Sequence, residues 1–292
     1  MTDKTPAPRK AAAKKTAAQA TAKPTAASAP KAASKAAPKA AAKAEPKPAA
    51  PSSTTPDFSV VVPVFDEGGA APALAREIAG AFGDRNYEMV FVNDASRDDT
   101  LKRLTDLKAE IPQLRVLSHH KNSGQSRSIR TGIIAARAPI IVTMDGDGQN
   151  DPADAPRLAE RLKAAPDTLA MVGGERVKRQ DSAAKRYASK VGNGVRNWLL
   201  KDGATDTGCG LKAFRRDAFL RLPYFDHIHR YLPALMRREG YDIAFEPVNH
   251  RHRETGVSKY TNFGRLKASV SDLMGVMWLQ SRSRLPGAVD EA

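Results

Sequence analysis

The chain has 292 residues, with 47 Lys or Arg against 32 Asp or Glu and a formal net charge of +15. At roughly 100–200 residues per domain, this length fits one or two domains. Cys209 is the single cysteine, which excludes an intramolecular disulfide and a disulfide-stapled secreted fold. The sequence contains neither a run of about 18 apolar residues nor a signal-peptide pattern, and we therefore expect a cytoplasmic protein.

We expect residues 1–56 to form a disordered basic arm. They include 21 Ala, 10 Lys and 9 Pro but no Val, Ile, Leu or aromatic residue, so they bury too little apolar surface to offset the entropy of ordering. The arm carries a net charge of +9, which leaves +6 for the rest of the chain. Three main interpretations stay open: a solubilising tail, attraction to an anionic membrane, or nonspecific contact with nucleic acid. A transit peptide is a minor alternative, because such peptides favour Arg and an amphipathic helix, whereas this arm has one Arg and many prolines.

From Phe58 onward, strand and helix patterns alternate. In chain order, we expect a strand at Phe58–Val64, a helix at Ala70–Phe82, a strand at Glu88–Val92, a helix at Asp98–Ala109, a strand at Arg115–Leu117, a helix at Ser126–Arg137, a strand at Ile140–Met144, a helix at Ala155–Ala164 and a strand at Leu169–Val172. Apolar strands that alternate with helices predict an α/β fold with a mainly parallel sheet covered on both faces.

Polar residues follow the first four expected strands. They are Asp66-Glu67, Asn93-Asp94, Asn122-Ser123-Gly124-Gln125 and the segment from Asp145 to Gln149. Ligands of such sheets bind outside the carboxyl ends of the strands. Turn chemistry alone would explain any one cluster, but four clusters at one edge predict a ligand site.

Asp145 and Asp147 form the centre of this site. Two carboxylates one residue apart repel each other unless a cation lies between them, and Gln149 adds a neutral oxygen. This sparse oxygen set is typical of Mg²⁺ or Mn²⁺ completed by water and substrate phosphates. Arg176 and other basic residues farther along the chain predict a binding region for a nucleotide diphosphate. We interpret Cys209 as a packing residue, because no motif places a base beside it.

The segment after residue 262 has a helical apolar pattern. Leu266, Val270, Leu273 and Met277 recur at helical spacing, with Met274 and Trp278 beside them and basic residues on both flanks. Two interpretations stay open: an amphipathic helix in the headgroup region of a membrane, or a terminal helix packed on the sheet. We therefore expect an arm over 1–56, a globular domain over 57–262, and a C-terminal helix and tail over 263–292.

Seven segments together resemble the family-2 glycosyltransferases with a GT-A fold. They are VVPVFDE (61–67), VNDASRDDT (92–100), KNSGQ (121–125), MDGDGQNDP (144–152), DSAAKR (181–186), DTGCGLKAFRRD (206–217) and RETGVSKY (253–260). Within the family, the chain is most similar to the polyprenyl-phosphate sugar transferases, such as dolichol-phosphate mannose synthase and its undecaprenyl-phosphate relatives. Two segments depart from the family pattern, with Phe65-Asp66 for Tyr-Asn and Asn93-Asp94-Ala95 for Asp-Asp-Gly.

The resemblance implies a role for each matching residue. Donor-binding residues would be Pro63, Phe65, Glu67, Asp94, Asn122, Gln125, Asp145, Arg176, Arg253 and Lys259. Metal ligands would be Asp145, Asp147 and Gln149, for Mg²⁺ or Mn²⁺. Catalytic residues would be Asp147, Asp206 and Lys212, of which Asp206 and Lys212 fall in the acceptor-side segment.

The implied reaction is metal-dependent, inverting transfer of a hexose from a nucleotide-diphosphate sugar to a polyprenyl phosphate. The implied setting is peripheral contact with the cytoplasmic face of a membrane, with a membrane subunit as a possible partner. One alternative is a glycan or soluble hydroxyl acceptor, for which Asp206 would act as the base. A second, less favoured alternative is an inactive glycosyltransferase-like domain whose basic arm binds nucleic acid; the intact motifs disfavour nucleic acid as a partner.

Overall fold

The computed structural model describes residues 55–177, 192, 194–251 and 262–287. Nearly all of the predicted arm, residues 1–56, lies outside these residues, as do the DSAAKR and RETGVSKY segments. Arg253 and Lys259 therefore also lie outside them. The division of the chain after residues 56 and 262 stays a prediction.

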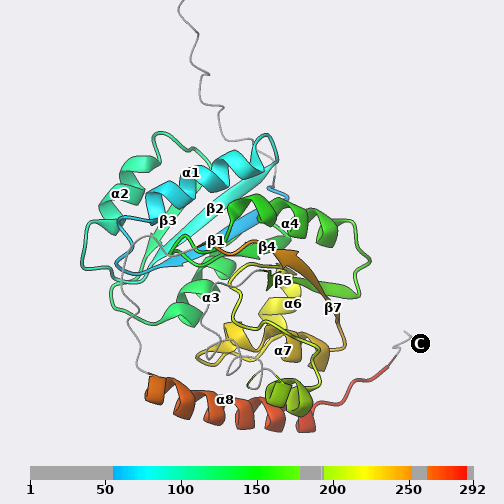
Figure 1. The fold of residues 1–292 in the computed structure, drawn as a ribbon. Coiled ribbons are helices and arrows are strands. Elements are labelled where there is room, and N and C mark those ends of the chain that lie inside the picture. The colour runs from blue at the N-terminus through cyan, green and yellow to red at the C-terminus, as the bar shows by residue number, and fades with distance from the viewer. Residues whose placement is uncertain (1–54, 178–191, 193, 252–261, 288–292) are drawn as a thin grey trace, which may run out of the picture. The chain divides into compact units, whose positions relative to one another are not determined.

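Seven strands of the described chain form one sheet in the order β3-β2-β1-β4-β6-β5-β7 (Figure 1). Their bounds are β1 Phe58–Val64, β2 Tyr87–Asn93, β3 Leu114–Ser118, β4 Ile140–Thr143, β5 Leu169–Arg176, β6 Lys212–Arg215 and β7 Asp242–Val248. β6 runs antiparallel to β4 and β5, whereas the other neighbouring strands pair in parallel. The mainly parallel α/β sheet predicted from the sequence is thus confirmed.

Helices cover both faces of this sheet (Figure 1). Their bounds are α1 Ala71–Phe82, α2 Thr100–Leu107, α3 Gln125–Ala135, α4 Ala155–Lys163, α6 Arg216–Arg221, α7 Leu232–Arg238 and α8 Asn262–Arg282, with short 3₁₀ turns η1 Pro152–Asp154 and η2 Ile228–Arg230. Alternate residues of β1 belong to different hydrophobic clusters: Val60 and Val62 pack with α1, α2 and α4, and Val61 packs with α3, α6 and α7. This alternation is the two-residue period of a strand buried on both faces.

Two local features explain where the helices lie. Gly132 lets α3 approach β1 closely, because a Cβ at this position would overlap the side chain of Val61. α2 begins at Thr100 rather than at the expected Asp98, because the Asp98 carboxylate accepts hydrogen bonds from the backbone N–H groups of Thr100 (3.0 Å) and Gly68 (3.1 Å). Asp98 therefore lies outside the helix and fixes the first turn of α2 to the loop after β1.

The C-terminal helix α8 packs against α7 and the same cluster as α3. Val276 is buried, and Leu273, Met277 and Leu279 are partly buried against that cluster. The Arg238 guanidinium donates to the backbone O of Leu279 at 3.2 Å. The predicted stripe is therefore split: Leu273 and Met277 face the core, whereas Val270 is exposed. Among the described helices, none is both long and apolar enough to cross a membrane.

Candidate active site

The polar clusters that follow β1, β2, β3 and β4 lie at one edge of the sheet, as predicted. Neighbouring loops are joined directly there: the Asp94 N–H donates to the backbone O of Val64 at 2.9 Å, and the Asp66 N–H donates to the hydroxyl of Ser96 at 3.0 Å. The loop that contains Gly146 lies against Pro63, because a Cβ on Gly146 would be 2.7 Å from the Pro63 carbonyl oxygen. Parallel pairing of β2, β1 and β4 therefore brings the predicted residues into one site.

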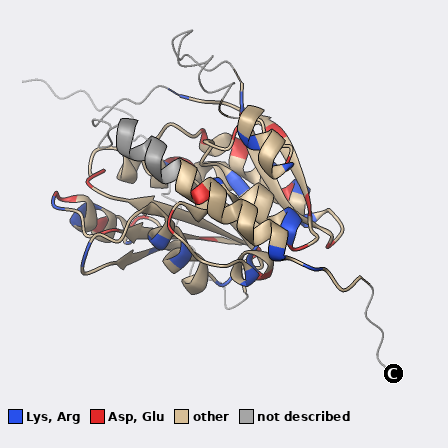
Figure 2. Cartoon of the chain, turned by 90° about the horizontal axis from the view of Figure 1, so that it is seen from below, with Lys and Arg blue, Asp and Glu red and all other residues tan. Residues whose placement is uncertain are grey.

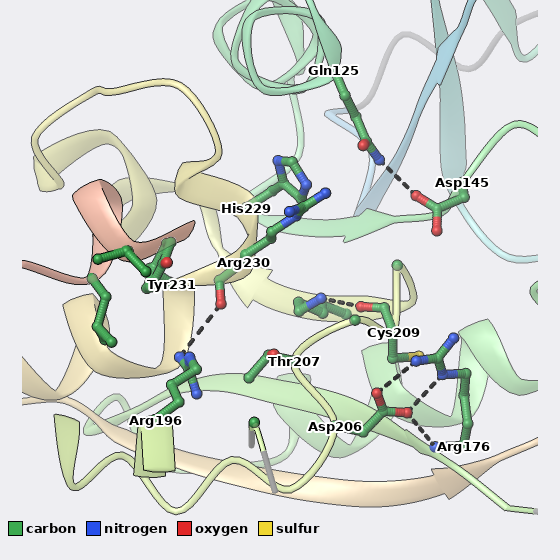
Figure 3. A pocket seen from close by; sticks show the side chains of 16 residues that line it. Gln125, Asp145, Arg176, Arg196, Asp206, Thr207, Cys209, His229, Arg230 and Tyr231 are labelled. Carbon is green, nitrogen blue, oxygen red and sulfur yellow. Dashed lines mark hydrogen bonds and ion pairs between the residues drawn. The ribbon is translucent and has the colours of Figure 1, made fainter. Parts of the chain in front are cut away.

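Asp145 lies two residues after the end of β4, and its partly buried carboxylate faces the pocket. The Gln125 side-chain amide donates to Oδ1 of Asp145 at 2.8 Å (Figure 3). Desolvation, followed by the negative charge of Asp147, raises the pKa of Asp145 to about 6, against the opposing charges of Lys212 and Arg176. The local environment thus disfavours a bare carboxylate at Asp145 and favours a cation beside it.

The donor set suits Mg²⁺ or Mn²⁺. Asp145 and Asp147 are the two adjacent carboxylates, and Asp147 also accepts a hydrogen bond from the backbone N–H of Gln149 at 3.1 Å. In the described part of the chain, no cluster of three or more His, Cys, Asp or Glu side chains forms a metal cage. A hard cation here would therefore take further oxygen ligands from water or substrate phosphates.

Arg176 and Asp206 form a paired group on the opposite wall of the site. The Arg176 guanidinium donates to both carboxylate oxygens of Asp206, at 2.6 and 2.7 Å, and the Arg176 backbone N–H donates at 3.2 Å. Both side chains are largely buried, with 15% and 7% exposed. This bidentate pair fixes the orientation of the guanidinium.

Lys212 begins β6 and is buried between these two parts of the site. Its ammonium donates to the backbone O of Cys209, and burial lowers the pKa of Lys212, although Asp145 and Asp206 oppose that shift. The thiol of Cys209 is buried as well, and desolvation raises its pKa. Cys209 is thus in a poor environment for a thiolate nucleophile and suits the packing role that we expected.

These groups line a pocket of about 620 Å³ (Figure 3). Its residues are Gln125, Asp145, Arg176, Gly192, Arg196, Asp206, Thr207, Gly208, Cys209, Gly210, Lys212, His229, Arg230, Tyr231, Val270 and Leu273. The predicted residues Gln125, Asp145, Arg176, Asp206 and Lys212 are therefore brought together. One end of the pocket is charged, whereas Val270 and Leu273 of α8 supply apolar side chains.

The predicted nucleoside-binding residues lie along the loops after β1 and β2. The Phe65 ring lies 5.9 Å from the Arg97 guanidinium carbon, and the backbone O of Glu67 accepts hydrogen bonds from the first residues of α1. The Asp94 carboxylate accepts from the backbone N–H groups of Ser123 (2.9 Å) and Gly124 (2.8 Å). Asp94 thus fixes the loop that leads into α3.

Two other predicted positions belong to loops that meet this site. The side chain of Asn122 donates to the backbone O of Asp94 at 3.2 Å. Gln149 accepts, through its backbone O, a 2.9 Å hydrogen bond from the N–H of Arg251. The chain that leads to Arg253 and Lys259 therefore passes beside the Asp145–Gln149 loop before it leaves the described residues.

Several pocket residues were not predicted from the sequence. His229, Arg230 and Tyr231 come from η2 and the start of α7, and Arg196 comes from the helical residues 194–200. The His229 ring contacts the hydroxyl of Ser126 through Nδ1 at 2.7 Å. Desolvation, followed by the charges of Arg230 and Lys212, lowers the pKa of His229 well below its usual value. The only sequence signal is a cluster of basic residues, His227, His229 and Arg230, shortly before Pro233 in the first turn of α7.

Solved structures support the fold. Glucosyl-3-phosphoglycerate synthase from Mycobacterium tuberculosis, solved with Mn²⁺, uridine diphosphate and glucosyl-3-phosphoglycerate, superposes with a TM-score of 0.59. The two sequences are 17% identical, and the match covers 80% of this chain and 82% of that chain. The same enzyme has also been solved with Mg²⁺ and uridine diphosphate. At this identity, the likeness shows the GT-A fold alone.

Relatives with higher sequence identity show the family as well as the fold. Dodecaprenyl-phosphate galacturonate synthase of Rhizobium johnstonii is 32% identical over 79% of this chain and 69% of its own length. Undecaprenyl-phosphate 4-deoxy-4-formamido-L-arabinose transferase of Klebsiella pneumoniae is 33% identical over 74% of this chain and 66% of its own length. This chain thus spans about two thirds of these relatives. The family model "Glycosyl transferase family 2" matches residues 59–222, and the chain belongs to this family.

Proposed function

We propose that this glycosyltransferase moves a hexose from a nucleotide-diphosphate sugar to a polyprenyl phosphate, with inversion at the sugar. The observation that carries the proposal is the pocket in which Asp145 faces the Arg176–Asp206 pair across Lys212. The two sequence relatives are both polyprenyl-phosphate sugar transferases, which supports the same acceptor.

The donor diphosphate would bind at the Asp145–Gln149 loop. Asp145, Asp147 and Gln149 would hold Mg²⁺ or Mn²⁺, which when bound neutralises phosphate charge on the leaving nucleoside diphosphate. Gln125 orients the Asp145 carboxylate through its 2.8 Å hydrogen bond. Pro63 near the end of β1, together with the loop residues Phe65, Glu67, Asp94 and Asn122, would surround the nucleoside.

A phosphate acceptor fits the state of Asp206 better than a hydroxyl acceptor does. A hydroxyl needs a base, whereas a phosphate monoester, with a second pKa of about 6, is already mostly dianionic at neutral pH. Both carboxylate oxygens of Asp206 accept hydrogen bonds from Arg176. We therefore assign Asp206 to the positioning of Arg176 rather than to proton transfer.

The reaction then needs few proton movements. A phosphate oxygen of the acceptor attacks the anomeric carbon while the bond from that carbon to the nucleoside diphosphate breaks. The pair of electrons in that bond leaves with the diphosphate, and the product is a lipid phosphosugar. Lys212 and Arg176 would stabilise the phosphate charge that accumulates between the two substrates.

Arg253 and Lys259 would complete the phosphate-binding side. Both follow Arg251, whose N–H is bonded to the backbone O of Gln149. Arg251 therefore lies beside the Asp145–Gln149 loop, two residues before Arg253. We expect Arg253 to contact phosphate through a bidentate guanidinium and Lys259 to contact it as a point charge.

A lipid acceptor requires contact with a membrane, and the outer face of α8 is suited to that contact. This face consists of Val270, Met274 and Trp278, whose exposed fractions are 55%, 63% and 59%. Figure 2 shows α8 with few charged residues along its middle and basic residues near its C-terminal end, where Arg282 and Arg284 are exposed. We propose peripheral association with the cytoplasmic face of a membrane, aided by the basic arm and by a membrane subunit.

A donor panel tests the proposed activity. The purified full-length chain is mixed with a polyprenyl-phosphate extract, Mg²⁺ or Mn²⁺, and one radiolabelled nucleotide sugar at a time. We expect label in the organic-extractable lipid with one donor, and none in the matched reaction with Asp147→Ala. Label that enters only water-soluble glycan would instead support the hydroxyl-acceptor alternative.

A further inference from the structure

Arg230 projects its side chain into the pocket from η2 (Figure 3). Its backbone is held on both sides: Ile228 and Tyr231 are buried, and the Arg230 carbonyl accepts a 3.4 Å hydrogen bond from Arg196. In the part of the chain that the structure describes, no carboxylate forms an ion pair with the Arg230 guanidinium. A fixed backbone therefore presents a guanidinium that forms no ion pair with a carboxylate of the described residues.

The other two pocket arginines differ from Arg230 in this respect. Arg176 is held by both oxygens of Asp206, and Arg196 donates to both oxygens of the buried Asp202, at 3.2 and 2.5 Å. A guanidinium already paired with a carboxylate offers less positive charge to a ligand. Arg230 is thus the pocket arginine best able to take an incoming anion.

Two basic residues lie near Arg230, and among the described residues no carboxylate forms an ion pair with it. His229 and Lys212 line the same pocket, and the His229 ring is fixed by its 2.7 Å contact with the Ser126 hydroxyl. Burial, followed by the positive charges of Arg230 and Lys212, lowers the pKa of His229 and disfavours its protonation. In a neutral imidazole that accepts the Ser126 hydroxyl proton at Nδ1, the Nε2–H is left to donate a hydrogen bond to a phosphate oxygen.

The lining of the pocket becomes more apolar away from Arg230. Tyr231, Val270 and Leu273 form part of its wall, and Val270 continues onto the exposed outer face of α8. A ligand with an anionic head and an apolar chain would match this arrangement, with the head at Arg230 and the chain along α8. Asp145, by contrast, lies on the donor side and would repel an anion that lacked a cation.

We propose that Arg230 is the anchor for the phosphate of the acceptor, with His229 as a positioning residue beside it. This assignment rests on the proposed function, because it names the group that binds the polyprenyl phosphate. It separates the two phosphate sites of the enzyme: the donor diphosphate at the Asp145–Gln149 loop, and the acceptor monophosphate at Arg230. It also makes Arg230 a residue that acts on acceptor binding without acting on donor binding.

Steady-state kinetics of Arg230→Ala and Arg230→Lys test this separation. We expect Arg230→Ala to raise the KM for polyprenyl phosphate by about tenfold or more, since it removes a charged hydrogen-bond donor. The KM for the nucleotide sugar should stay close to that of the unmodified protein. Arg230→Lys should recover only part of the acceptor affinity, because an ammonium lacks the bidentate fork. An unchanged acceptor KM, or a raised donor KM, would overturn the assignment.

The matched control is Arg221→Ala on α6, which removes the same charge from an exposed side chain outside the pocket. It should leave both KM values and the melting temperature unchanged. Equal loss of acceptor affinity in Arg221→Ala and Arg230→Ala would show a general charge effect and overturn the proposal.

Direct binding keeps the proposal testable even if no sugar transfer is found. Calorimetry compares farnesyl phosphate, farnesol and inorganic phosphate with the full-length chain. Farnesyl phosphate that binds the unmodified protein, but binds Arg230→Ala about tenfold more weakly or worse, supports the anchor independently of activity. Equal binding to both proteins, or no binding to either, contradicts it. Inorganic phosphate shows whether the headgroup alone suffices, and farnesol shows what the apolar chain contributes.

Discussion

Gly210 lies directly against the carboxylate of Asp145, so closely that a Cβ at residue 210 would overlap both carboxylate oxygens. The Gly210 carbonyl is held by a 3.0 Å hydrogen bond from the hydroxyl of Thr143 on β4. The backbone therefore cannot easily move away to make room. The absence of a side chain at residue 210 is what leaves Asp145 in its position beside Gln125.

We predict that Gly210→Ala strongly reduces sugar transfer. The new methyl group would push the Asp145 carboxylate from its place, and a displacement of about 1 Å in a reacting group can cost about 100-fold in rate. The free energy of unfolding should fall by about 1–3 kcal/mol, as is usual for overpacking. Enzyme assay and chemical denaturation of the same preparation measure the two effects.

Gly80→Ala is the matched control for this substitution. Gly80 lies within α1, and an added Cβ there has no neighbour within 4 Å. Replacing a helical glycine by alanine should raise stability by about 0.5–1 kcal/mol and leave activity unchanged. Normal activity in Gly210→Ala would mean that the position of Asp145 is unimportant for the reaction.

Asp147→Ala should abolish transfer without unfolding the protein. Asp147 is a partly exposed loop residue, so its loss removes little packing, and it also removes the negative charge that disfavours ionisation of Asp145. Excess EDTA should stop the unmodified enzyme in the same way, and added Mg²⁺ or Mn²⁺ should restore it. Full activity in EDTA, or in Asp147→Ala, would refute the metal assignment.

Asp206→Asn should behave as the loss of a positioning group. Removing one partner of a buried ion pair costs about 3–5 kcal/mol, so the free energy of unfolding should fall measurably together with activity. The matched control is Glu110→Gln, which breaks the Arg76–Glu110 pair with both side chains 53% exposed; an exposed pair contributes less than about 1 kcal/mol. A large fall in kcat with unchanged stability would instead identify Asp206 as a general base and favour a hydroxyl acceptor.

The parallel half of the sheet could be predicted because each of its central strands is an apolar run in the sequence. β1 matches the predicted range Phe58–Val64, since an unbroken apolar run indicates a strand buried on both faces. β7 was missed because it lies at the edge of the sheet, where its residues are mostly half-exposed and include Glu246 and Pro247. Edge strands lack the apolar run that makes a central strand visible in a sequence.

The residues on the two sides of the pocket also differed in how well the sequence predicted them. Asp145 and Gln125 follow predicted elements, so the topology of a parallel sheet was enough to bring them together. Arg230 lines the same pocket but comes from a short 3₁₀ turn, whose position depends on the burial of Ile228 and Tyr231 in tertiary contacts. No local periodicity predicts such a turn.

Tertiary contacts also determine which residues of the apolar stripe in α8 are buried. Leu273 and Met277 share helical spacing with Val270, but they pack against the core cluster whereas Val270 does not. The sequence pattern indicated an amphipathic helix correctly but could not tell which apolar side chains a neighbouring helix would cover.

Membrane contact should depend on the outer face of α8. We predict that Met274→Asp combined with Trp278→Asp weakens flotation with anionic vesicles, because it places two charges on an apolar contact surface. Deletion of residues 1–56 should weaken flotation as well and reduce its salt sensitivity. The control Ser271→Asp changes an exposed polar residue of α8 and should float nearly as well as the unmodified chain. Unchanged flotation of the double variant would mean that the membrane contact lies elsewhere.

The nature of the acceptor is tested most directly by two lipids that differ only in a phosphate. The purified chain, its preferred radiolabelled nucleotide sugar and Mg²⁺ are combined with either undecaprenyl phosphate or undecaprenol, and the lipid products are separated and counted. We predict labelled lipid phosphosugar from undecaprenyl phosphate and no labelled lipid from undecaprenol. Equal labelling of undecaprenol, or transfer only to a water-soluble hydroxyl, would contradict the proposed function.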